Sequence, residues 1–233
     1  MILYKFFRGI FRIVLKGLYR YESIGYENVP NEGPVILCCN HISNWDPPLL
    51  GCGIDRQVSY MAKEELFRFP VLSHVLKSFN AIPVKRGGND RGAIRTTLQV
   101  LEQGRVFGIF PEGTRSKSGE LGEGKTGVAM FALKSEATIV PVAIIGPYRL
   151  FHKVKVVYGK PIDISMYREA KSSSDTMREV TQVIMGEIQK LKILINSSTV
   201  DYLEFVWFFQ YHHILIATLT CLNFGRPHAI GGV

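Results

Sequence analysis

Apolar and polar positions along this chain change repeatedly between a strand-like and a helix-like pattern. Short apolar runs predict buried strands at 35–39, 58–61, 81–84, 106–110, 139–145 and 154–158. Longer stretches with helical spacing predict helices that begin at Asp46 and that span 63–78 (broken near Pro70), 90–102, 126–135 and 175–194. Because strands and helices alternate without an internal repeat, the pattern predicts an α/β fold with a mixed, mostly parallel sheet flanked by helices.

The first twenty residues have an amphipathic pattern of their own. Basic residues recur at helical spacing, within an arc of about 120°, at Lys5, Arg8, Arg12, Lys16 and Arg20. The opposite side carries Phe6, Phe7, Ile10, Phe11, Ile13, Val14 and Leu18. Basic residues interrupt the segment too often for a membrane span, and no signal-peptide cleavage site follows. We therefore expect a helix in the bilayer interface with its cationic stripe towards anionic head groups; the alternative is an amphipathic helix docked on the domain.

The C-terminal residues depart from the α/β pattern. Residues 205–222 contain no Asp, Glu, Lys or Arg, but Gln210, Tyr211, His212 and His213 interrupt them and make spanning a membrane costly. The two histidines have no partner ligands at metal-binding spacing. The predicted organisation is a membrane-association helix at 1–20, an α/β domain at 21–195 and a hydrophobic extension at 196–233. The sequence does not decide whether this extension is an interfacial hairpin, a weak anchor or a strain-specific addition.

Composition narrows the partners and the compartment. A chain of 233 residues with 46% hydrophobic content fits one domain with a sizeable core. Its net charge of +8 favours an anionic partner: nucleic acid, a phospholipid surface or a phosphorylated substrate. Of four cysteines, Cys38 and Cys39 are adjacent in a predicted strand and point to opposite faces, which argues against a disulfide framework. No metal-binding Cys or His spacing occurs, and a reducing, cytoplasmic setting is expected.

A histidine and a carboxylate follow the strand at 35–39. In the stretch from Asn40 to Pro48, His41 and Asp46 can pair if the loop between them folds back, because on a continuous helix they would face apart. In such a pair the acid fixes the imidazole tautomer and stabilises the imidazolium, so that the histidine can activate a substrate hydroxyl. The alternative is that Asp46, followed by two prolines, serves only as a helix N-cap.

A second group of polar residues follows the strand at 106–110. Pro111 ends that strand, so Glu112, Gly113, Thr114 and Arg115 lie on a loop at a strand end, where open α/β sheets bind their ligands. The planar guanidinium of Arg115 can bind a phosphate with two hydrogen bonds, and Gly113 allows close backbone approach. The alternative is that Glu112 and Arg115 form an ion pair that braces the loop.

A basic turn follows the strand at 81–84. Lys85 and Arg86 precede two glycines and then a predicted helix, and such a turn can hold phosphate through backbone N–H groups and cationic side chains. The same run also suits a solvated connection without a ligand.

Taken together, these blocks resemble the glycerolipid acyltransferases, most closely the 1-acylglycerol-3-phosphate acyltransferases. The resemblance extends from Tyr21 to Gln189. In that family the histidine and aspartate of the first block are catalytic, and here they are His41 and Asp46. The block from Glu112 to Arg115 matches the motif that the family links to the phosphate of the substrate.

Two further blocks match the family in the same order along the chain. One comprises residues 63–66 and 81–87, with Lys63 and Arg86 as its basic residues. The other is at 139–142, which the family places near the acyl-binding surface.

The resemblance implies acyl transfer from acyl-CoA or acyl-acyl carrier protein to the sn-2 hydroxyl of lysophosphatidic acid, giving phosphatidic acid. His41 would be the general base and Asp46 would orient it. The implied substrate-binding residues are Lys63, Lys85, Arg86, Glu112, Gly113, Thr114 and Arg115. No cofactor or metal is expected, and the implied location is the cytoplasmic face of the cell membrane, in peripheral or monotopic association with anionic lipids.

Three other functions remain as alternatives. The acceptor could be glycerol 3-phosphate or another lysophospholipid, although enzymes for the former usually carry extra domains. A non-catalytic protein that binds anionic membranes would explain the charge but not the order of the blocks. Nucleic-acid binding explains the charge alone, and because no recognition motif supports it, no nucleic-acid partner is expected.

Overall fold

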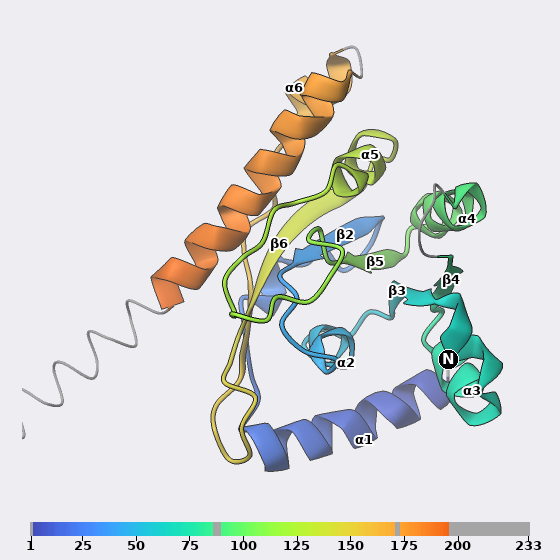
Figure 1. Cartoon of the computed structure of the whole chain (residues 1–233), viewed down its shortest axis with the longest axis vertical. Helices are drawn as coiled ribbons and strands as arrows, with labels where there is room; N and C mark the ends of the chain where they lie inside the picture. The colour runs from blue at the N-terminus through green and yellow to red at the C-terminus, as the bar shows by residue number, and fades with distance from the viewer. Residues whose placement is uncertain (1, 86–89, 171–172, 196–233) are drawn as a thin grey trace, which may run out of the picture. The chain divides into compact units, whose positions relative to one another are not determined.

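A seven-stranded sheet forms the centre of the computed structural model, which describes residues 2–85, 90–170 and 173–195 (Figure 1). The strands in sheet order are β1 (Glu22–Ile24), β7 (Lys155–Tyr158), β6 (Thr138–Ile145), β2 (Val35–Cys39), β5 (Val106–Ile109), β3 (Val58–Lys63) and β4 (Ile82–Val84). Only β6 and β7 pair antiparallel; all other neighbours are parallel. The predicted α/β fold with a mixed, mostly parallel sheet is therefore confirmed.

The central strands are apolar on both faces because helices cover both sides of the sheet. Every residue of β2 is buried, as expected for a parallel strand between two helical layers. Val35, Leu37 and Cys39 belong to the core on one face, and Ile36 and Cys38 belong to the core on the other. A continuous apolar run in the sequence thus becomes two separate cores.

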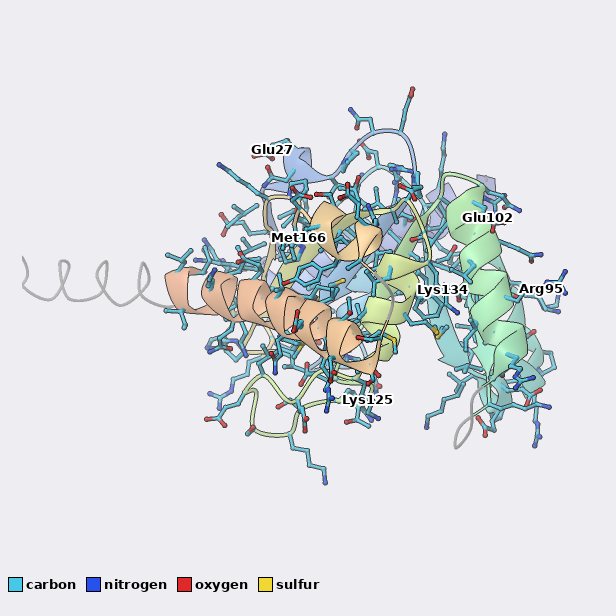
Figure 2. All side chains as sticks on the ribbon, turned by 90° about the horizontal axis from the view of Figure 1, so that it is seen from above. Glu27, Arg95, Glu102, Lys125, Lys134 and Met166 are labelled. Atoms are coloured by element: carbon cyan, nitrogen blue, oxygen red, sulfur yellow. The ribbon has the colours of Figure 1, made fainter. Side chains whose placement is uncertain are left out.

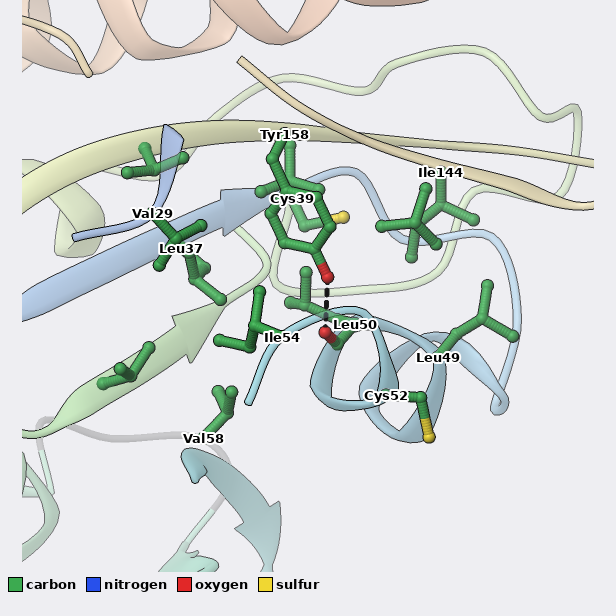
Figure 3. Close-up of a cluster of buried hydrophobic side chains, with 14 of the residues drawn as sticks. Val29, Leu37, Cys39, Leu49, Leu50, Cys52, Ile54, Val58, Ile144 and Tyr158 are labelled. Atoms are coloured by element: carbon green, nitrogen blue, oxygen red, sulfur yellow. Dashed lines mark hydrogen bonds between the residues drawn. The ribbon is translucent and has the colours of Figure 1, made fainter. Parts of the chain in front are cut away.

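Two helices cover the first face: α1 (Ile2–Tyr19) and α2 (Asp46–Cys52). Figure 3 shows part of this core, in which Leu49 and Leu50 of α2 lie with residues of the sheet. The Tyr158 hydroxyl donates a hydrogen bond of 2.6 Å to the Leu50 carbonyl, so the polar end of a buried ring has a partner. This contact fixes α2, and hence the residue at its start, against the sheet.

The second face is covered by α4 (Arg91–Glu102), α5 (Gly127–Leu133) and a helix over 174–195. Figure 2 views these helices from above, with Arg95 on α4 and Lys134 at the end of α5. The remaining elements are α3 (Pro70–Ser78), α6 (Ser165–Glu169) and 3₁₀ helices at Tyr26–Asn28 and Glu64–Arg68. The structure therefore has two helical layers, one on each face of the sheet.

The break predicted near Pro70 in the helix over 63–78 is confirmed, but the part before the break is not an α-helix. Lys63 ends strand β3, a 3₁₀ helix follows, and α3 begins only at Pro70. The break falls at Phe69, which is extended (φ −86°, ψ 114°), because a residue before proline is disfavoured in the helical conformation. Strand β1 and helix α6 were not predicted, since each is too short to show a periodic pattern.

Helix α1 docks on the domain through part of its cationic stripe. Arg8 donates to the carbonyls of Ile54 (3.1 Å) and Asp55 (2.6 Å), and Arg12 donates to that of Cys52 (2.8 Å). These carbonyls lie at and just beyond the end of α2, where helix carbonyls lack internal partners and attract cations. The prediction that the whole stripe faces the membrane is therefore wrong for Arg8 and Arg12.

The outer side of α1 carries exposed apolar side chains. Phe6, Ile10 and Ile13 are 60%, 43% and 75% exposed, whereas Tyr4 and Leu15 on the inner side are buried. Lys5 and Lys16 remain exposed beside the apolar side chains. The helix thus has an inner face for the domain and an outer face that mixes apolar and cationic groups.

Within the described ranges, no helix is long and apolar enough to cross a membrane. The predictions for 196–233, including those for 205–222 and for His212 and His213, concern residues outside these ranges. Cys38, Cys39 and Cys52 are free thiols and buried.

Candidate active site

The candidate site lies at the carboxyl ends of four neighbouring parallel strands. His41 follows β2, the loop with Glu112 and Arg115 follows β5, Lys63 ends β3 and Lys85 follows β4. Because these strands are adjacent and parallel, their ends meet at one edge of the sheet, where ligands bind in open α/β folds. With neighbouring strands about 4.8 Å apart, the site extends over about 14 Å from β2 to β4.

His41 and Asp46 form the predicted pair. The Nδ1 atom of His41 lies 2.6 Å from Oδ2 of Asp46. The same oxygen accepts the backbone N–H groups of Ile42 (2.6 Å) and Ser43 (2.8 Å), so the loop between the two residues folds back. Because a carboxylate oxygen can only accept, Nδ1 carries the proton and Nε2 is left as the basic nitrogen.

Asp46 does not cap α2. The N-cap position belongs to Trp45, and Asp46 is the first residue inside the helix. Its carboxylate turns back towards the loop and is completely buried. The N-cap alternative is therefore wrong, although a negative charge in the first turn still interacts favourably with the helix dipole.

Tyr148 is a further partner of this carboxylate, which sequence reasoning missed. Its hydroxyl donates to Oδ1 of Asp46 from the segment that follows β6. Burial, and then the charge of Asp46, raise the pKa of Tyr148, so the phenol stays protonated and remains a donor. No spacing rule could have found it, because the two residues are 102 positions apart in the chain.

Further contacts hold both the ring and the backbone of His41. Its ring stacks on Phe110, with centroids 4.2 Å apart and an angle of 21° between the planes. Its backbone N–H donates to Oε1 of Glu112 (2.8 Å), and its carbonyl accepts the N–H of Ser116 (2.7 Å). The side chain nevertheless keeps 18% of its surface exposed, so the histidine is oriented without being sealed from a substrate.

Glu112 is a buried brace between two segments. While Oε1 accepts from His41, Oε2 accepts the N–H of Gly122 (2.8 Å), so backbone groups engage both carboxylate oxygens. A Cβ at Gly122 would lie 2.9 Å from Oε2, which explains the glycine. Bracing was one alternative for this residue, but in the described part of the chain no ion pair joins Glu112 to Arg115.

Several cationic side chains surround this edge of the sheet. Lys63, Lys85 and Arg115 are exposed, and none of them forms an ion pair with a described residue. Arg86 lies outside the described residues. Thr114 is exposed on the same loop as Arg115.

Lys125 is another cation at this site, and sequence reasoning did not single it out. Its backbone N–H donates to the Pro111 carbonyl (2.9 Å), which brings the side chain over Gly113. A Cβ at Gly113 would lie 3.0 Å from Nζ of Lys125. Gly113 also has φ +68°, a conformation that residues with side chains rarely adopt. The absence of a side chain at Gly113 therefore allows both the positive φ of the turn and the close approach of Lys125.

Within the described ranges, no three or more His, Cys, Asp or Glu side chains converge as metal ligands. The geometry instead suits proton transfer. An oriented imidazole with a basic Nε2, a buried carboxylate behind it and free cations alongside can deprotonate a hydroxyl on an anionic substrate.

Comparison with known proteins places the same residues in a family. The sequence model of the family described as Acyltransferase matches residues 20–145, a range that holds His41, Asp46 and the loop after β5. The 1-acyl-sn-glycerol-3-phosphate acyltransferase of Bacillus subtilis (strain 168) is 31% identical over 197 residues, covering 82% of this chain and 97% of that protein. The protein of the same name from Borreliella burgdorferi is 29% identical, covering 71% of this chain and 69% of its own.

A solved structure shares the architecture. The crystal structure of the 1-acyl-sn-glycerophosphate (LPA) acyltransferase PlsC from Thermotoga maritima superposes with a TM-score of 0.63 at 27% sequence identity. The match covers 82% of this chain and 78% of that one.

Proposed function

This chain belongs to the acyltransferase family, and we propose that it acylates the sn-2 hydroxyl of lysophosphatidic acid, giving phosphatidic acid. The observation that carries the proposal is the 2.6 Å contact between His41 and a fully buried Asp46, beside cations at the same sheet edge that form no ion pair with a described residue. The relatives named for this reaction support the choice of acceptor.

In the proposed mechanism, His41 is the general base. Its Nε2 takes the proton of the acceptor hydroxyl as the oxygen attacks the thioester carbonyl of the acyl donor. The tetrahedral intermediate collapses with loss of the thiolate, which recovers the proton from the imidazolium. Asp46 stabilises that imidazolium, and Lys63 or backbone N–H groups are candidates to stabilise the oxyanion. The donor is acyl-CoA or acyl-acyl carrier protein, and the scheme uses no cofactor or metal.

We assign the phosphate of the acceptor to the cations at the sheet edge. Arg115 offers a planar fork for two phosphate oxygens, and Lys63, Lys85 and Lys125 add point charges. Thr114 would contribute its backbone N–H group. The Gly113 N–H already donates to the Phe110 carbonyl (2.9 Å), so Gly113 would contribute only the close backbone approach that its missing side chain allows. Arg86 remains a predicted partner. Glu112 would act on the substrate indirectly, because its carboxylate already holds the backbone of His41 and of Gly122.

We further propose that the outer face of α1 binds the bilayer interface, on the cytoplasmic side of the membrane. Other exposed apolar side chains lie near both ends of this helix. Phe69 and Val71 of the α3 segment are 62% and 81% exposed, and Leu150 and Phe151 of the β6–β7 loop are 56% and 68% exposed. In Figure 1, α1 runs between α3 and this loop, which supports one continuous apolar surface.

The activity is tested with the full chain and three acceptors. Lysophosphatidic acid, glycerol 3-phosphate and lysophosphatidylcholine are each offered with acyl-CoA and with acyl-acyl carrier protein, and acylated products are measured by mass spectrometry. We expect turnover with lysophosphatidic acid and at least one donor. Faster acylation of either other acceptor would replace the proposed substrate, and binding to vesicles without any acyl transfer would favour the non-catalytic alternative.

The membrane surface is tested by sedimentation with liposomes. Phe6→Ser with Ile13→Ser should weaken binding to neutral and anionic liposomes alike, because apolar burial is lost. Lys5→Gln with Lys16→Gln should weaken binding to anionic liposomes only, since each cation near such a surface contributes about 1 kcal/mol. Met166→Ser removes an equally exposed apolar side chain from α6 and is the matched control. Unchanged binding of the first variant would disprove the assigned surface.

A further inference from the structure

We infer that Tyr148 is a positioning residue of the reaction, which ties the carboxylate of Asp46 to the last turn of α1. The inference rests on the proposed function, because it concerns the same histidine–aspartate pair. It adds a third residue to that pair and links it physically to the helix assigned to the membrane.

Asp46 is a buried charge whose two carboxylate oxygens both need hydrogen-bond donors. Asp46 has no exposed surface, and its Oδ2 already serves His41, Ile42 and Ser43. In the described part of the chain, the Tyr148 hydroxyl is the one group that donates a hydrogen bond to Oδ1. A buried carboxylate oxygen without a donor is costly, so this hydroxyl stabilises the charged form of Asp46.

A series of ring contacts links Tyr148 to α1. The Tyr148 ring packs edge-on against Tyr19, with centroids 5.9 Å apart and planes at 77°. Tyr19 also contacts the ring of Trp45, the residue that directly precedes Asp46, at 6.4 Å. The last turn of α1 therefore touches both the donor of the carboxylate and the start of the helix that carries it.

Backbone hydrogen bonds fasten the same two segments together. The N–H of Phe151 donates to the Leu18 carbonyl (2.6 Å), and the N–H of Val154 donates to that of Tyr19 (3.0 Å). The loop that carries Tyr148 is thus attached to the end of α1 on both sides of its turn. A shift of α1 would move Tyr148, and through it the hydrogen bonding of Asp46.

Loss of the Tyr148 hydroxyl should change the proton affinity of the histidine–aspartate pair in one direction. The titratable groups around the pair come from every neighbouring element: Cys39, Glu112, Tyr148 and Tyr19. Burial and the charge of Asp46 raise the pKa of Cys39, so this thiol stays neutral, as does the Tyr148 phenol. Removing the Tyr148 donor makes the carboxylate more basic, and the histidine–aspartate pair then takes up a proton more readily.

The test is Tyr148→Phe in the full chain, with Tyr26→Phe as the matched control because Tyr26 is exposed and follows β1, which ends at the opposite edge of the sheet from His41. We expect kcat to fall about 10- to 100-fold, the range for a lost hydrogen bond to a buried charge, with KM for both substrates unchanged. The acid limb of the pH–kcat profile should shift to higher pH. A uniform loss of rate without this shift would reduce Tyr148 to a structural role and overturn the inference, as would an unchanged kcat.

A second variant keeps the test decisive. Tyr19→Leu retains the Tyr148 hydroxyl but removes its contact with α1, so it should shift the acid limb in the same direction by a smaller amount. In the double variant the two effects should be less than additive, because both act through one carboxylate. Full additivity would contradict the link. If the wild-type protein acylates lysophosphatidic acid but these variants match it, only this inference fails; if the wild type does not, the proposed function fails.

Discussion

Replacing Asp46 by asparagine removes the charge behind His41 while preserving its hydrogen bonds. The amide oxygen can occupy the position of Oδ2 and accept from His41 Nδ1 and from the N–H groups of Ile42 and Ser43. The amide nitrogen then faces the Tyr148 hydroxyl, which can rotate and accept instead of donate. We therefore expect Asp46→Asn to fold normally with the same histidine tautomer.

The loss of rate follows from the electrostatics of the pair. With Nδ1 and Oδ2 2.6 Å apart, the centres of the imidazolium and carboxylate charges are about 4 Å apart, which corresponds to about 4 kcal/mol at an effective dielectric constant of about 20. That energy stabilises the imidazolium only after the proton has been taken up. Asp46→Asn should therefore lower kcat by about 10²–10³-fold and leave KM nearly unchanged.

The assay is release of the thiol carrier with lysophosphatidic acid in excess, together with thermal melting of each variant. Asp175→Asn, at an exposed position, is the matched control and should retain full activity. Asp46→Ala should behave differently and melt at a lower temperature, because it leaves buried donors without an acceptor at a cost of about 1–3 kcal/mol for each unsatisfied group. A near wild-type kcat in folded Asp46→Asn would refute the role of the charge.

Three further predictions concern the base, the phosphate and the core. His41→Ala should lower kcat by about 10²–10⁴-fold, and combining it with Asp46→Asn should cost little more, because the pair acts as a unit; additive losses would contradict this. Arg115→Ala should raise KM for lysophosphatidic acid far more than for the donor, with Arg115→Lys intermediate; the reverse pattern would place Arg115 at the carrier. Burial raises the pKa of Cys52 from 9.0 to about 11, so the folded protein holds a proton that the unfolded chain releases. Its contribution to the free energy of unfolding should be complete below about pH 9 and fall by up to about 1.4 kcal/mol per unit towards pH 11, and urea titrations should show a shallower decline in Cys52→Ala.

The layered fold was predictable because local pattern and burial agree. Strand β2 has the predicted bounds, 35–39, since all five residues are apolar and a turn precedes them. The start of α4 was also readable, because Asp90 caps it by accepting the N–H of Ala93 (3.0 Å). Such signals lie within a few residues of the feature that they predict.

The site could be read from the sequence only in part. His41 and Asp46 are five residues apart, so chemistry and spacing were enough to suggest that they pair. Tyr148 and the bracing by Glu112 depend instead on which strands are neighbours, over separations of 102 and 71 residues. Sheet order is a property of the whole domain, and no local pattern encodes it.

The orientation of α1 shows a different limit. Periodicity showed which residues share a face, but not which face meets the domain. Arg8 and Arg12 turn inward because carbonyls at the end of α2 lack donors, a need that appears only once α2 is in place. The sequence correctly placed the apolar residues of α1 on a common side of the helix. It did not show that part of this group faces outward, away from the domain.

The hydrogen bond between Glu112 and Gly122 also separates two kinds of position in the loop after β5: those that should resist mutation and those that should tolerate it. A side chain at Gly122 would collide with the carboxylate that holds His41, so this position can hardly vary without loss of activity. Lys117, Ser118 and Glu120, by contrast, are exposed, whereas Gly119 between them has φ +80°, a conformation that residues with side chains rarely adopt. Loop exchange between relatives, or directed evolution towards other acceptors, should therefore vary residues 117, 118 and 120 and retain Gly119 and both ends of the brace.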